Sequence, residues 1–487
     1  MVSEGVRDAD VLVVGAGLSG ICAAYYLQEL AGELPGQTFA VLEARETFGG
    51  TWDLFKYPGI RSDSDMYTLG FGFHPWRDAS AIADASAIMA YLKETLEAYD
   101  LERHVRYGRR AVSASWSAEA ARWTVVVRAA GGEEEVWTCR FLWGCTGYYS
   151  YEGGHSPTFE GQDDFEGLIV HPQQWPEDLD YSGKRVVVIG SGATAVTLVP
   201  AMAGDAAHVT MLQRSPSYVF SLPREDEAAN RLRELLPERA AYAAARWKNI
   251  LWSMLTYNLS RRFPEQMRAY IGRHVQEQLG EGVPVDPHFN PTYRPWDQRM
   301  CLVPDGDLFE AIKRGDAEVV TDHIERFVPG GVLLRSGRVL EADVIVTATG
   351  LRLELAGGMT LEVDGQPVIP SEHMMYRGAM LSGVPNLVMS LGYTNASWTL
   401  KCELVSQYFC RVIKHMSARD QRMFVPRHDP SMAERPLLDL DSGYIRRAQA
   451  FMPSQGEALP WRLYQNYLLD LALLRYSAVE DGVLELR

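Results

Sequence analysis

VLVVGAGLSG, residues 11–20, is the stretch that decides the fold, because it joins a β-branched run to a glycine turn and a helix start. Gly15, Gly17 and Gly20 permit a tight turn, a close approach of backbone to a pyrophosphate, and close packing of helix on strand. The helix N-terminus, where Ser19 lies, then faces the phosphates. This pattern predicts a Rossmann-like dinucleotide-binding unit.

An acidic residue follows at the distance that such a unit requires. Glu43 closes the next apolar run, FAVLEA (residues 39–44), about twenty residues beyond the glycine turn. A carboxylate there accepts hydrogen bonds from ribose hydroxyls, which favours an unphosphorylated adenosine such as that of FAD or NAD. The alternative is an ordinary surface glutamate at a strand end.

A second signature, VVVIGSGATA (residues 186–195), repeats the strand, turn and helix. The following strand ends in Arg214 and Ser215, where the first unit has its glutamate. A cation and a hydroxyl suit a 2′-phosphate, so NADPH is favoured over NADH, unless Arg214 pairs with a surface acid. The residues that we expect to bind this second dinucleotide are Gly190, Gly192, Ala193, Thr194, Arg214 and Ser215.

Between the two signatures lies FEGLIVHPQQWP, residues 165–176. Its pattern F-x-G-x-x-x-H-x-x-x-W-P resembles the identifying motif of the flavin-dependent Baeyer-Villiger monooxygenases. The resemblance implies that the linker couples domain movement to the position of NADPH. The alternative is a structural linker in which Phe165 and Trp175 fill a core and His171 caps a turn. The motif residues are Phe165, Gly167, His171, Trp175 and Pro176.

GGTWDLFKYPGIRSD, residues 49–63, is similar to a second motif of that family. The resemblance implies that Thr51, Trp52, Asp53 and Asp63 line the flavin, with Asp63 near the reacting edge. It also places the backbone of Val112 against the adenine. On physical grounds alone the glycine pair allows close backbone approach and the aromatics supply flat walls, as a glycine turn entering an aromatic core also would.

FNPTYRPWDQRMCLVPDGDLFEAI, residues 289–312, resembles the branch of the family that includes an ethionamide-activating mycobacterial enzyme. By that resemblance Arg299 is the active-site arginine; the alternative is a structural salt bridge. Many relatives carry a lysine before this arginine that touches NADP, whereas Gln298 stands here.

The predicted fold class is α/β, with two Rossmann-like dinucleotide-binding domains, for FAD and NADPH, and a helical insertion. The FAD domain is expected to comprise residues 1–147 and 350–487. The NADPH domain is expected at 148–224, which includes the linker motif, and at 291–349, with the helical insertion at 225–290 between them.

Two further predictions concern helices. In the insertion, Trp252, Met254, Leu255 and Tyr257 are predicted to form the core, because aromatic and methionine residues at helical spacing usually do. The alternatives are that they wall a substrate cavity or touch a membrane surface. Later in the chain, Asn395 is predicted to cap a long helix whose N-terminus points at the flavin and stabilises negative charge there.

Composition narrows the function. The 487 residues carry a formal net charge of −16, which argues against nucleic acid because phosphate binding needs a basic surface. The six cysteines form no C-x-x-C pair, which removes a zinc site and a redox disulfide of that type, so no metal is expected. Without an apolar run of transmembrane or signal-peptide length, we expect a cytoplasmic enzyme.

The resemblance therefore implies an NADPH- and O2-dependent flavoprotein monooxygenase. Its expected reaction inserts one oxygen next to a ketone carbonyl, through a C4a-peroxyflavin, and gives an ester or lactone. Thioethers are a second expected substrate class. Two alternatives stay open: an N- or S-oxygenating flavin monooxygenase, and a flavoprotein that serves as a redox-sensing or binding module with little oxygenation.

Overall fold

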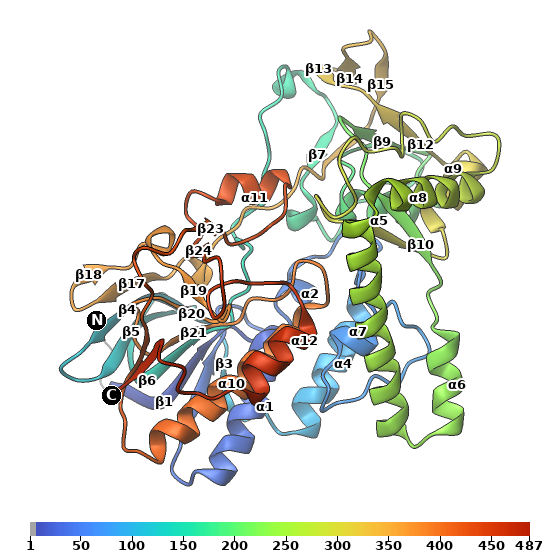
Figure 1. Ribbon diagram of the computed structural model, residues 1–487. Helices are drawn as coiled ribbons and strands as arrows, with labels where there is room; N and C mark the ends of the chain where they lie inside the picture. Colours follow the sequence, from blue (N-terminus) through green and yellow to red (C-terminus); the bar gives the residue numbers. More distant parts are fainter. Residues whose placement is uncertain (1–5) are drawn as a thin grey trace.

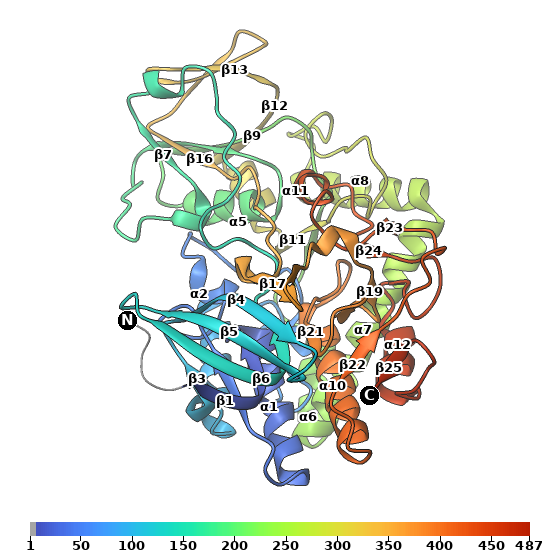
Figure 2. The same ribbon diagram turned by 90° about the vertical axis from the view of Figure 1, so that its left-hand side faces the viewer.

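Two β-sheets organise residues 6–487, which are the residues that the computed structural model describes (Figure 1). The larger sheet has nine strands, and the smaller sheet has five parallel strands. Figure 2 shows the larger sheet below and the smaller sheet above. The predicted α/β architecture with two strand–turn–helix units is therefore present.

The larger sheet combines a parallel half with an antiparallel half. In the parallel half the order is β3-β2-β1-β6-β21. On the other side of β6 the order is β6-β5-β4-β17-β18, in which β17 runs parallel to β4 and the other neighbours pair antiparallel. Its strands are β1 (Arg7–Val14), β2 (Phe39–Leu42), β3 (Val105–Arg106), β4 (Arg109–Ser117), β5 (Arg122–Ala129), β6 (Glu134–Gly144), β17 (Thr360–Val363), β18 (Gln366–Pro367) and β21 (Leu387–Met389).

Both faces of this parallel half are covered. On one face, α1 (Leu18–Glu33) and α10 (Trp398–Ser417) pack together in one core with Val11 and Val13. On the other face Leu12 packs against the antiparallel strands. A parallel strand buried on both faces reads as a continuous apolar run, which is why residues 11–14 are uniformly hydrophobic.

The smaller sheet has the order β12-β9-β8-β16-β7 and carries the second glycine turn between β8 and α5. Helices α5, α8 and α9 cover one of its faces, and the three-stranded sheet β13-β14-β15 covers the other. The elements are β7 (Leu168–Val170), β8 (Arg185–Ile189), α5 (Ala193–Met202), β9 (His208–Gln213), α9 (Asp307–Arg314), β12 (Ala317–Thr321), β13 (Ile324–Val328), β14 (Gly331–Leu334), β15 (Val339–Glu341) and β16 (Val344–Thr347).

Three helices occupy the region where the helical insertion was predicted: α6 (Glu227–Leu235), α7 (Glu238–Arg262) and α8 (Pro264–Leu279). The shorter elements are α2 (Thr51–Leu54), α3 (Met66–Leu69), α4 (Ala85–Ala98), β10 (Val219–Leu222), β11 (Cys301–Pro304), β19 (Met375–Tyr376), β20 (Met380–Leu381), β22 (Phe424–Pro426), β23 (Arg435–Pro436), α11 (Gly443–Ala448), β24 (Ser454–Gln455), α12 (Tyr467–Asp470) and β25 (Leu484–Leu486).

The chain passes between the two sheets twice, and the two connecting segments pair with each other. The amide of Ser150 donates to the carbonyl of Arg352 at 2.9 Å, and that of His155 donates to Gly350 at 2.9 Å. The amide of Glu354 donates to the carbonyl of Tyr148, also at 2.9 Å. The crossing points therefore form a single paired connection beside the cavity described below.

The predicted core of the insertion is wrong for two residues. Trp252 and Leu255 are 61% and 50% exposed, while Met254 and Tyr257 are partly buried. The side of α7 that faces the protein is formed instead by Ala241, Tyr242, Ala245, Arg246 and Ile250. None of the described helices is long and apolar enough to cross a membrane.

Candidate active site

A cavity of about 570 Å³ opens where the carboxyl ends of β1, β2 and β6 approach α5 of the smaller sheet. Ligands in α/β proteins bind at such strand ends. The sequence-predicted residues that line it are Gly15, Gly17, Ser19, Glu43, Thr51, Trp52, Asp63, Ala193, Thr194 and Arg299. The two nucleotide signatures, the 49–63 segment and the arginine are thus brought together.

The first glycine turn has the conformation that its sequence predicts. Gly15 has a φ of +105°, and a Cβ there would lie 2.5 Å from the carbonyl oxygen of Cys145. A Cβ on Gly20 would lie 1.8 Å from the carbonyl oxygen of Gly15, so Gly20 sits behind the turn and outside the cavity lining. Only glycine fits both positions, and the backbone is left open toward the cavity.

Glu43 is buried under the same turn. Its carboxylate accepts a hydrogen bond from the amide of Ala16 at 2.7 Å and another from the amide of Arg45 at 2.9 Å. Burial raises the pKa of Glu43, while these amide donors oppose the increase. The carboxylate is therefore held in a fixed orientation at the cavity edge before any ligand binds.

Three observations show that a dinucleotide fits this half of the cavity. Gly15 leaves open a space beside the backbone that a Cβ would fill. Arg45 lines the cavity, and its buried Nη1 has no hydrogen-bond partner within residues 6–487. The ladder between β4 and β5 skips Val112, which releases the backbone of that residue from regular pairing. The side chain of Val112 is absent from the lining, where Arg110 and Ala111 stand instead.

Asp53 does not line the cavity. Its carboxylate pairs with Arg45 at 2.5 Å and with Lys56 at 3.1 Å. Its contact with the flavin stays a prediction, and the structure shows it positioning Arg45.

Asp63 and Arg299 meet across the cavity, although they are far apart in sequence. The Nη2 atom of Arg299 lies 3.2 Å from Oδ1 and 3.1 Å from Oδ2 of Asp63. The Asp63 carboxylate raises the pKa of Arg299, so the guanidinium stays charged. Beside the pair, burial raises the pKa of Tyr149 to about 12, which keeps that phenol protonated.

A second ion pair joins the same two regions. Arg61, whose side chain is only 7% exposed, donates from Nη1 to Asp307 at 2.5 Å and from Nη2 at 3.3 Å. Arg61 lines the cavity, and Asp307 is the first residue of α9. Sequence reasoning missed this pair, although Arg61 stands inside the 49–63 motif.

The second nucleotide signature borders the cavity through its helix start. Gly190 has a φ of +144°, and a Cβ there would lie 2.3 Å from the carbonyl oxygen of Ala348. Gly190 and Gly192 lie outside the lining. Arg214 and Ser215 are exposed just beyond β9, and Arg214 forms no ion pair with any carboxylate of residues 6–487.

The linker motif lies outside the cavity and packs against the smaller sheet. Phe165 stacks edge-on against Phe327, and a Cβ on Gly167 would lie 2.5 Å from the carbonyl oxygen of Asp343. His171 caps a short turn by accepting from the amide of Gln173 at 3.1 Å. Half-buried Trp175 packs edge-on against Tyr181, and Pro176 follows it. These contacts match the structural alternative, and the coupling role of the motif stays a prediction.

The prediction that Asn395 caps the long helix is wrong. The helix α10 begins at Trp398, with Ser397 as the preceding residue and no side-chain cap. The Asn395 amide instead donates to the carbonyl of Gln465 at 2.9 Å, because residues 463–466 pass close to the loop. The N-terminus of α10 reaches the cavity through Trp398, whose Nε1 donates to Ser19 at 2.8 Å.

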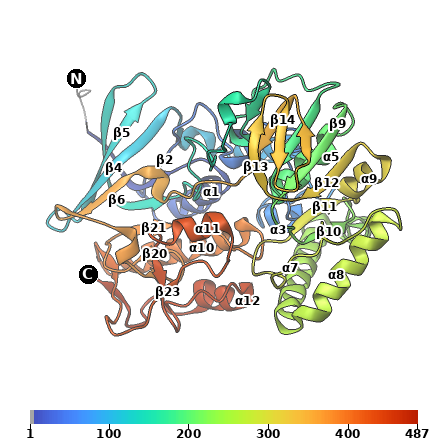
Figure 3. The ribbon, with the colours of Figure 1, turned by 90° about the horizontal axis from the view of Figure 1, so that it is seen from above.

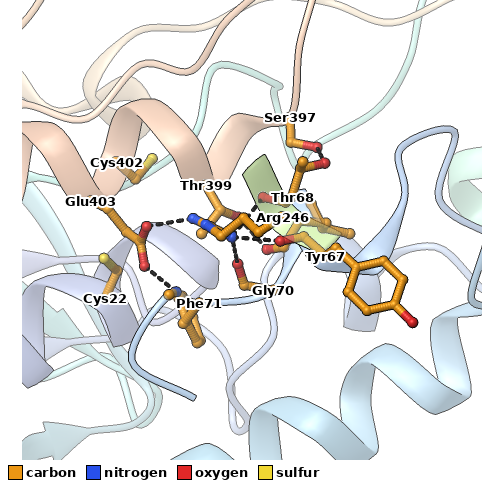
Figure 4. Close-up of polar contacts among 12 residues, drawn as sticks. Cys22, Tyr67, Thr68, Gly70, Phe71, Arg246, Ser397, Thr399, Cys402 and Glu403 are labelled. Carbon is orange, nitrogen blue, oxygen red and sulfur yellow. Dashed lines mark hydrogen bonds and ion pairs between the residues drawn. The ribbon is translucent and has the colours of Figure 1, made fainter. Parts of the chain in front are cut away.

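A buried arginine fastens the insertion to the larger sheet's side of the cavity (Figure 4). Arg246 of α7 pairs with Glu403 of α10 at 2.5 Å. It also donates to the carbonyls of Tyr67 and Gly70 at the end of α3, both at 2.7 Å. The other Glu403 oxygen accepts from the amide of Gly72 at 2.5 Å.

The fold and the site together define a protein in which two dinucleotide-binding units meet at one cavity. Comparison with known proteins identifies the family. The chain matches the model of flavin-binding monooxygenase-like proteins over residues 63–276, and that of the NAD(P)-binding Rossmann-like domain over residues 13–92.

Curated relatives match almost the whole chain. The FAD-containing monooxygenase EthA of Mycobacterium tuberculosis (strain ATCC 25618 / H37Rv) is 52% identical and covers 97% of this chain and 96% of its own length. The probable FAD-binding monooxygenase AlmA of Acinetobacter baylyi is 45% identical over 98% of this chain and 96% of its own. The chain therefore belongs to the flavin-binding monooxygenase family, as its motifs indicated.

A solved structure confirms the arrangement of the fold. An oxidised steroid monooxygenase bound to NADP aligns with a TM-score of 0.71 and 26% identity, covering 87% of this chain and 88% of that one. The predicted class, a flavoprotein monooxygenase on a Rossmann-like α/β fold, is confirmed.

Proposed function

We propose that the protein is an FAD- and NADPH-dependent Baeyer-Villiger monooxygenase, which converts a ketone into an ester or lactone and also oxidises thioethers. The observation that carries this proposal is the Arg299–Asp63 pair, a permanent cation held at 3.1 Å by a carboxylate inside a cavity that both nucleotide signatures border. The names of the relatives, FAD-containing and FAD-binding monooxygenases, support the cofactor assignment.

FAD fits the larger-sheet half of the cavity. The backbone around Gly15 and Gly17 would bind its pyrophosphate, and Glu43 would accept hydrogen bonds from its ribose. The Nη1 of Arg45, which is unpaired within residues 6–487, would donate to a further acceptor of FAD. NADPH fits the other half, with its pyrophosphate at the start of α5 and its 2′-phosphate at Arg214 and Ser215. When bound, FAD supplies the hydride acceptance and oxygen activation that this reaction class needs.

The role of this chain's residues is electrostatic and steric. The Arg299 guanidinium stabilises the negative charge that develops on the carbonyl oxygen of the ketone when the carbon is attacked. Asp63 holds the guanidinium in place, and one such contact in a closed site is worth roughly 3 kcal/mol, about a hundredfold in rate. Trp52, Tyr148 and Trp398 line the cavity with apolar surface that excludes water.

The activity is tested by an NADPH consumption assay in air with identified products. Linear, cyclic and aryl ketones are offered beside thioethers. Ketone-dependent NADPH consumption with ester formation is expected. Sulfoxide or hydroxylamine as the only product would favour an N- or S-oxygenating enzyme, and a slow peroxide release that no substrate changes would favour a binding module.

Arg299→Ala tests the assigned arginine. The variant should retain flavin reduction by NADPH, because the nucleotide contacts are elsewhere, but lose ester formation by about a hundredfold. Arg294→Ala, which removes an exposed arginine of the same segment, is the matched control and should keep the normal rate. Ester formation at an unchanged rate by Arg299→Ala would contradict the assignment.

A further inference from the structure

An exposed apolar stripe runs along the outer side of α7. Trp247, Leu251, Leu255, Leu259 and Phe263 follow one another at a spacing of four residues, and each exposes 40% to 51% of its surface. Trp252, beside them, is 61% exposed. Side chains four apart in a helix are neighbours offset by about 40°, so these residues form a ridge that winds around α7 towards its C-terminal end. Contiguous exposed apolar surface of this kind marks an interaction site.

The opposite side of α7 is firmly held, so the stripe is part of a rigid surface. Arg246 is locked by Glu403 and by two carbonyls at the end of α3 (Figure 4). One turn further on, Ile250 packs in a small core with Tyr393 and Leu400. The exposed side chains therefore cannot reach the protein interior by rotating the helix.

The stripe continues onto the C-terminal segment. The ring of Trp247 meets that of Tyr467 edge-on, with 5.9 Å between centroids, and Figure 3 shows α12 lying beside α7. Leu468 and Leu469 of α12 expose 42% and 44% of their surfaces. Two segments that are distant in sequence thus contribute to one apolar surface.

The stripe itself carries cations and no acid. Lys248 pairs with Asp226 and Arg261 pairs with Asp297, and exposed Glu265 follows beyond the end of the stripe. From Trp247 to Pro264 the chain has no acidic residue, although its formal net charge is −16. Arg262 lies over the ring of Phe263 at 5.9 Å, and Arg475 lies over that of Tyr476 at 5.7 Å. Neither arginine forms an ion pair with a carboxylate in the part of the chain that the structure describes.

We propose that this apolar stripe docks on the surface of an anionic lipid bilayer. A helix with tryptophan and leucine on its outer side, flanked by unpaired arginines, has the composition of an interfacial helix that lies in the membrane plane. The arginines face the negative lipid headgroups while their apolar stems follow the ring surfaces. A second copy of this chain is a poorer occupant, because a twofold contact would bring the same cations together.

The docked surface adjoins the site. Tyr257 of α7 meets Trp296 edge-on at 5.4 Å, and Arg261 pairs with Asp297 at 2.6 Å. These two contacts hold the segment that also carries Arg299. Docking therefore brings the membrane close to the cavity, which suits substrates that partition into lipid.

The test is sedimentation of the purified full-length protein with two kinds of vesicle. One kind contains phosphatidylcholine and phosphatidylglycerol in equal parts, and the other contains phosphatidylcholine alone. The wild-type protein should bind the anionic vesicles, with a blue shift of tryptophan emission and weaker binding at high salt. The double variant Trp252→Gln/Leu255→Gln should lose at least about tenfold in partition coefficient. The double variant Arg262→Glu/Arg475→Glu should lose about tenfold on anionic vesicles.

Matched controls distinguish binding through this surface from nonspecific binding of the protein to vesicles. Val339→Gln/Ile369→Gln removes exposed apolar residues from other parts of the surface, and Arg128→Glu reverses a remote exposed arginine. Both should bind as the wild type does. Ketone oxidation measured without vesicles should be unchanged in every variant, which shows that each one is folded.

Three outcomes would overturn the proposal. The first is absence of binding to anionic vesicles by the wild-type protein, and the second is equal binding by the Trp252→Gln/Leu255→Gln variant. The third is a wild-type dimer in sedimentation velocity that this variant dissociates while vesicle binding is unaffected, which would show that a second copy covers the stripe. The binding readouts do not depend on which reaction the enzyme catalyses.

Discussion

Arg214 is the residue on which the choice of nicotinamide cofactor depends. It is exposed just after β9 and is not neutralised by a carboxylate of residues 6–487. Arg214→Ala should raise the KM for NADPH by at least about tenfold, because a hydrogen bond between charged groups contributes roughly 1.5–3 kcal/mol. The KM for NADH should hardly change, since NADH lacks the 2′-phosphate.

Steady-state kinetics with both cofactors measure this effect. Arg335→Ala, which removes an exposed arginine of the same part of the molecule, is the control. An equal rise in KM for both cofactors would show that Arg214 supports the fold and does not read the 2′-phosphate.

At this scale the sequence predicted residue types better than side-chain directions. Glycine positions follow from backbone geometry, so Gly15 and Gly190 were identified correctly as turn residues. The expected contact of Asp53 with the flavin stays a prediction, whereas its ion pairs with Arg45 and Lys56 were not predicted. Both partners are close in sequence, and Lys56 stands within the 49–63 motif, but a motif does not record which side chains pair.

The buried pair between α7 and α10 determines the stability of the insertion. Arg246→Met should destabilise the protein by about 3–5 kcal/mol, because it leaves Glu403 buried without its cation. The double variant Arg246→Met/Glu403→Gln should recover part of that loss, since no uncompensated charge remains.

Thermal unfolding of the flavin-loaded protein measures the effect. Arg231→Met, on exposed α6, is the matched control and should stay within about 0.5 kcal/mol of wild type. A double variant less stable than Arg246→Met would mean that Glu403 is held chiefly by the Gly72 amide.

The same pair explains why the burial of α7 was predicted incorrectly. Apolar residues occur around the whole helix, so periodicity could not tell which side faces inward. The inward side is set by Arg246, a residue that a hydrophobic pattern places outside. The helical character of the insertion, by contrast, was predicted from the sequence, and α6, α7 and α8 occupy that region.

At the scale of the whole molecule, the pair formed by Arg61 and Asp307 joins the two halves of the cavity. Asp307→Asn keeps an acceptor for the amide of Leu308 but removes the carboxylate from a nearly buried guanidinium. The rate of flavin reduction by NADPH should fall by about tenfold, because a lost charged hydrogen bond costs roughly 1.5–3 kcal/mol. The FAD content should stay normal.

Rapid-mixing absorbance measurements under anaerobic conditions follow that reduction. Asp316→Asn, beyond the other end of α9, removes an exposed ion pair with Arg314 and should leave the rate unchanged. Loss of bound FAD in Asp307→Asn would show instead that the pair supports the larger-sheet half alone.

The overall arrangement was the easiest level to predict, because each glycine signature specifies a local strand–turn–helix unit. The sequence did not predict the contacts between units, such as Arg61 with Asp307 and Arg246 with Glu403. These depend on how two independently specified units are oriented, and no local pattern records that.

The paired crossing of the chain near residues 148–155 and 350–354 has a consequence for engineering. Because the two connecting segments lie side by side, the part of the chain between them leaves and re-enters the larger-sheet domain at one place. Replacing this segment with the corresponding piece of a relative requires matching this short ladder of backbone hydrogen bonds and the side-chain pairs that also join the segment to the rest, Arg61 with Asp307 and Arg246 with Glu403. Chimaeras joined at these two connecting segments should exchange cofactor preference and lipid affinity together, because Arg214 and α7 both lie in the exchanged part of the chain.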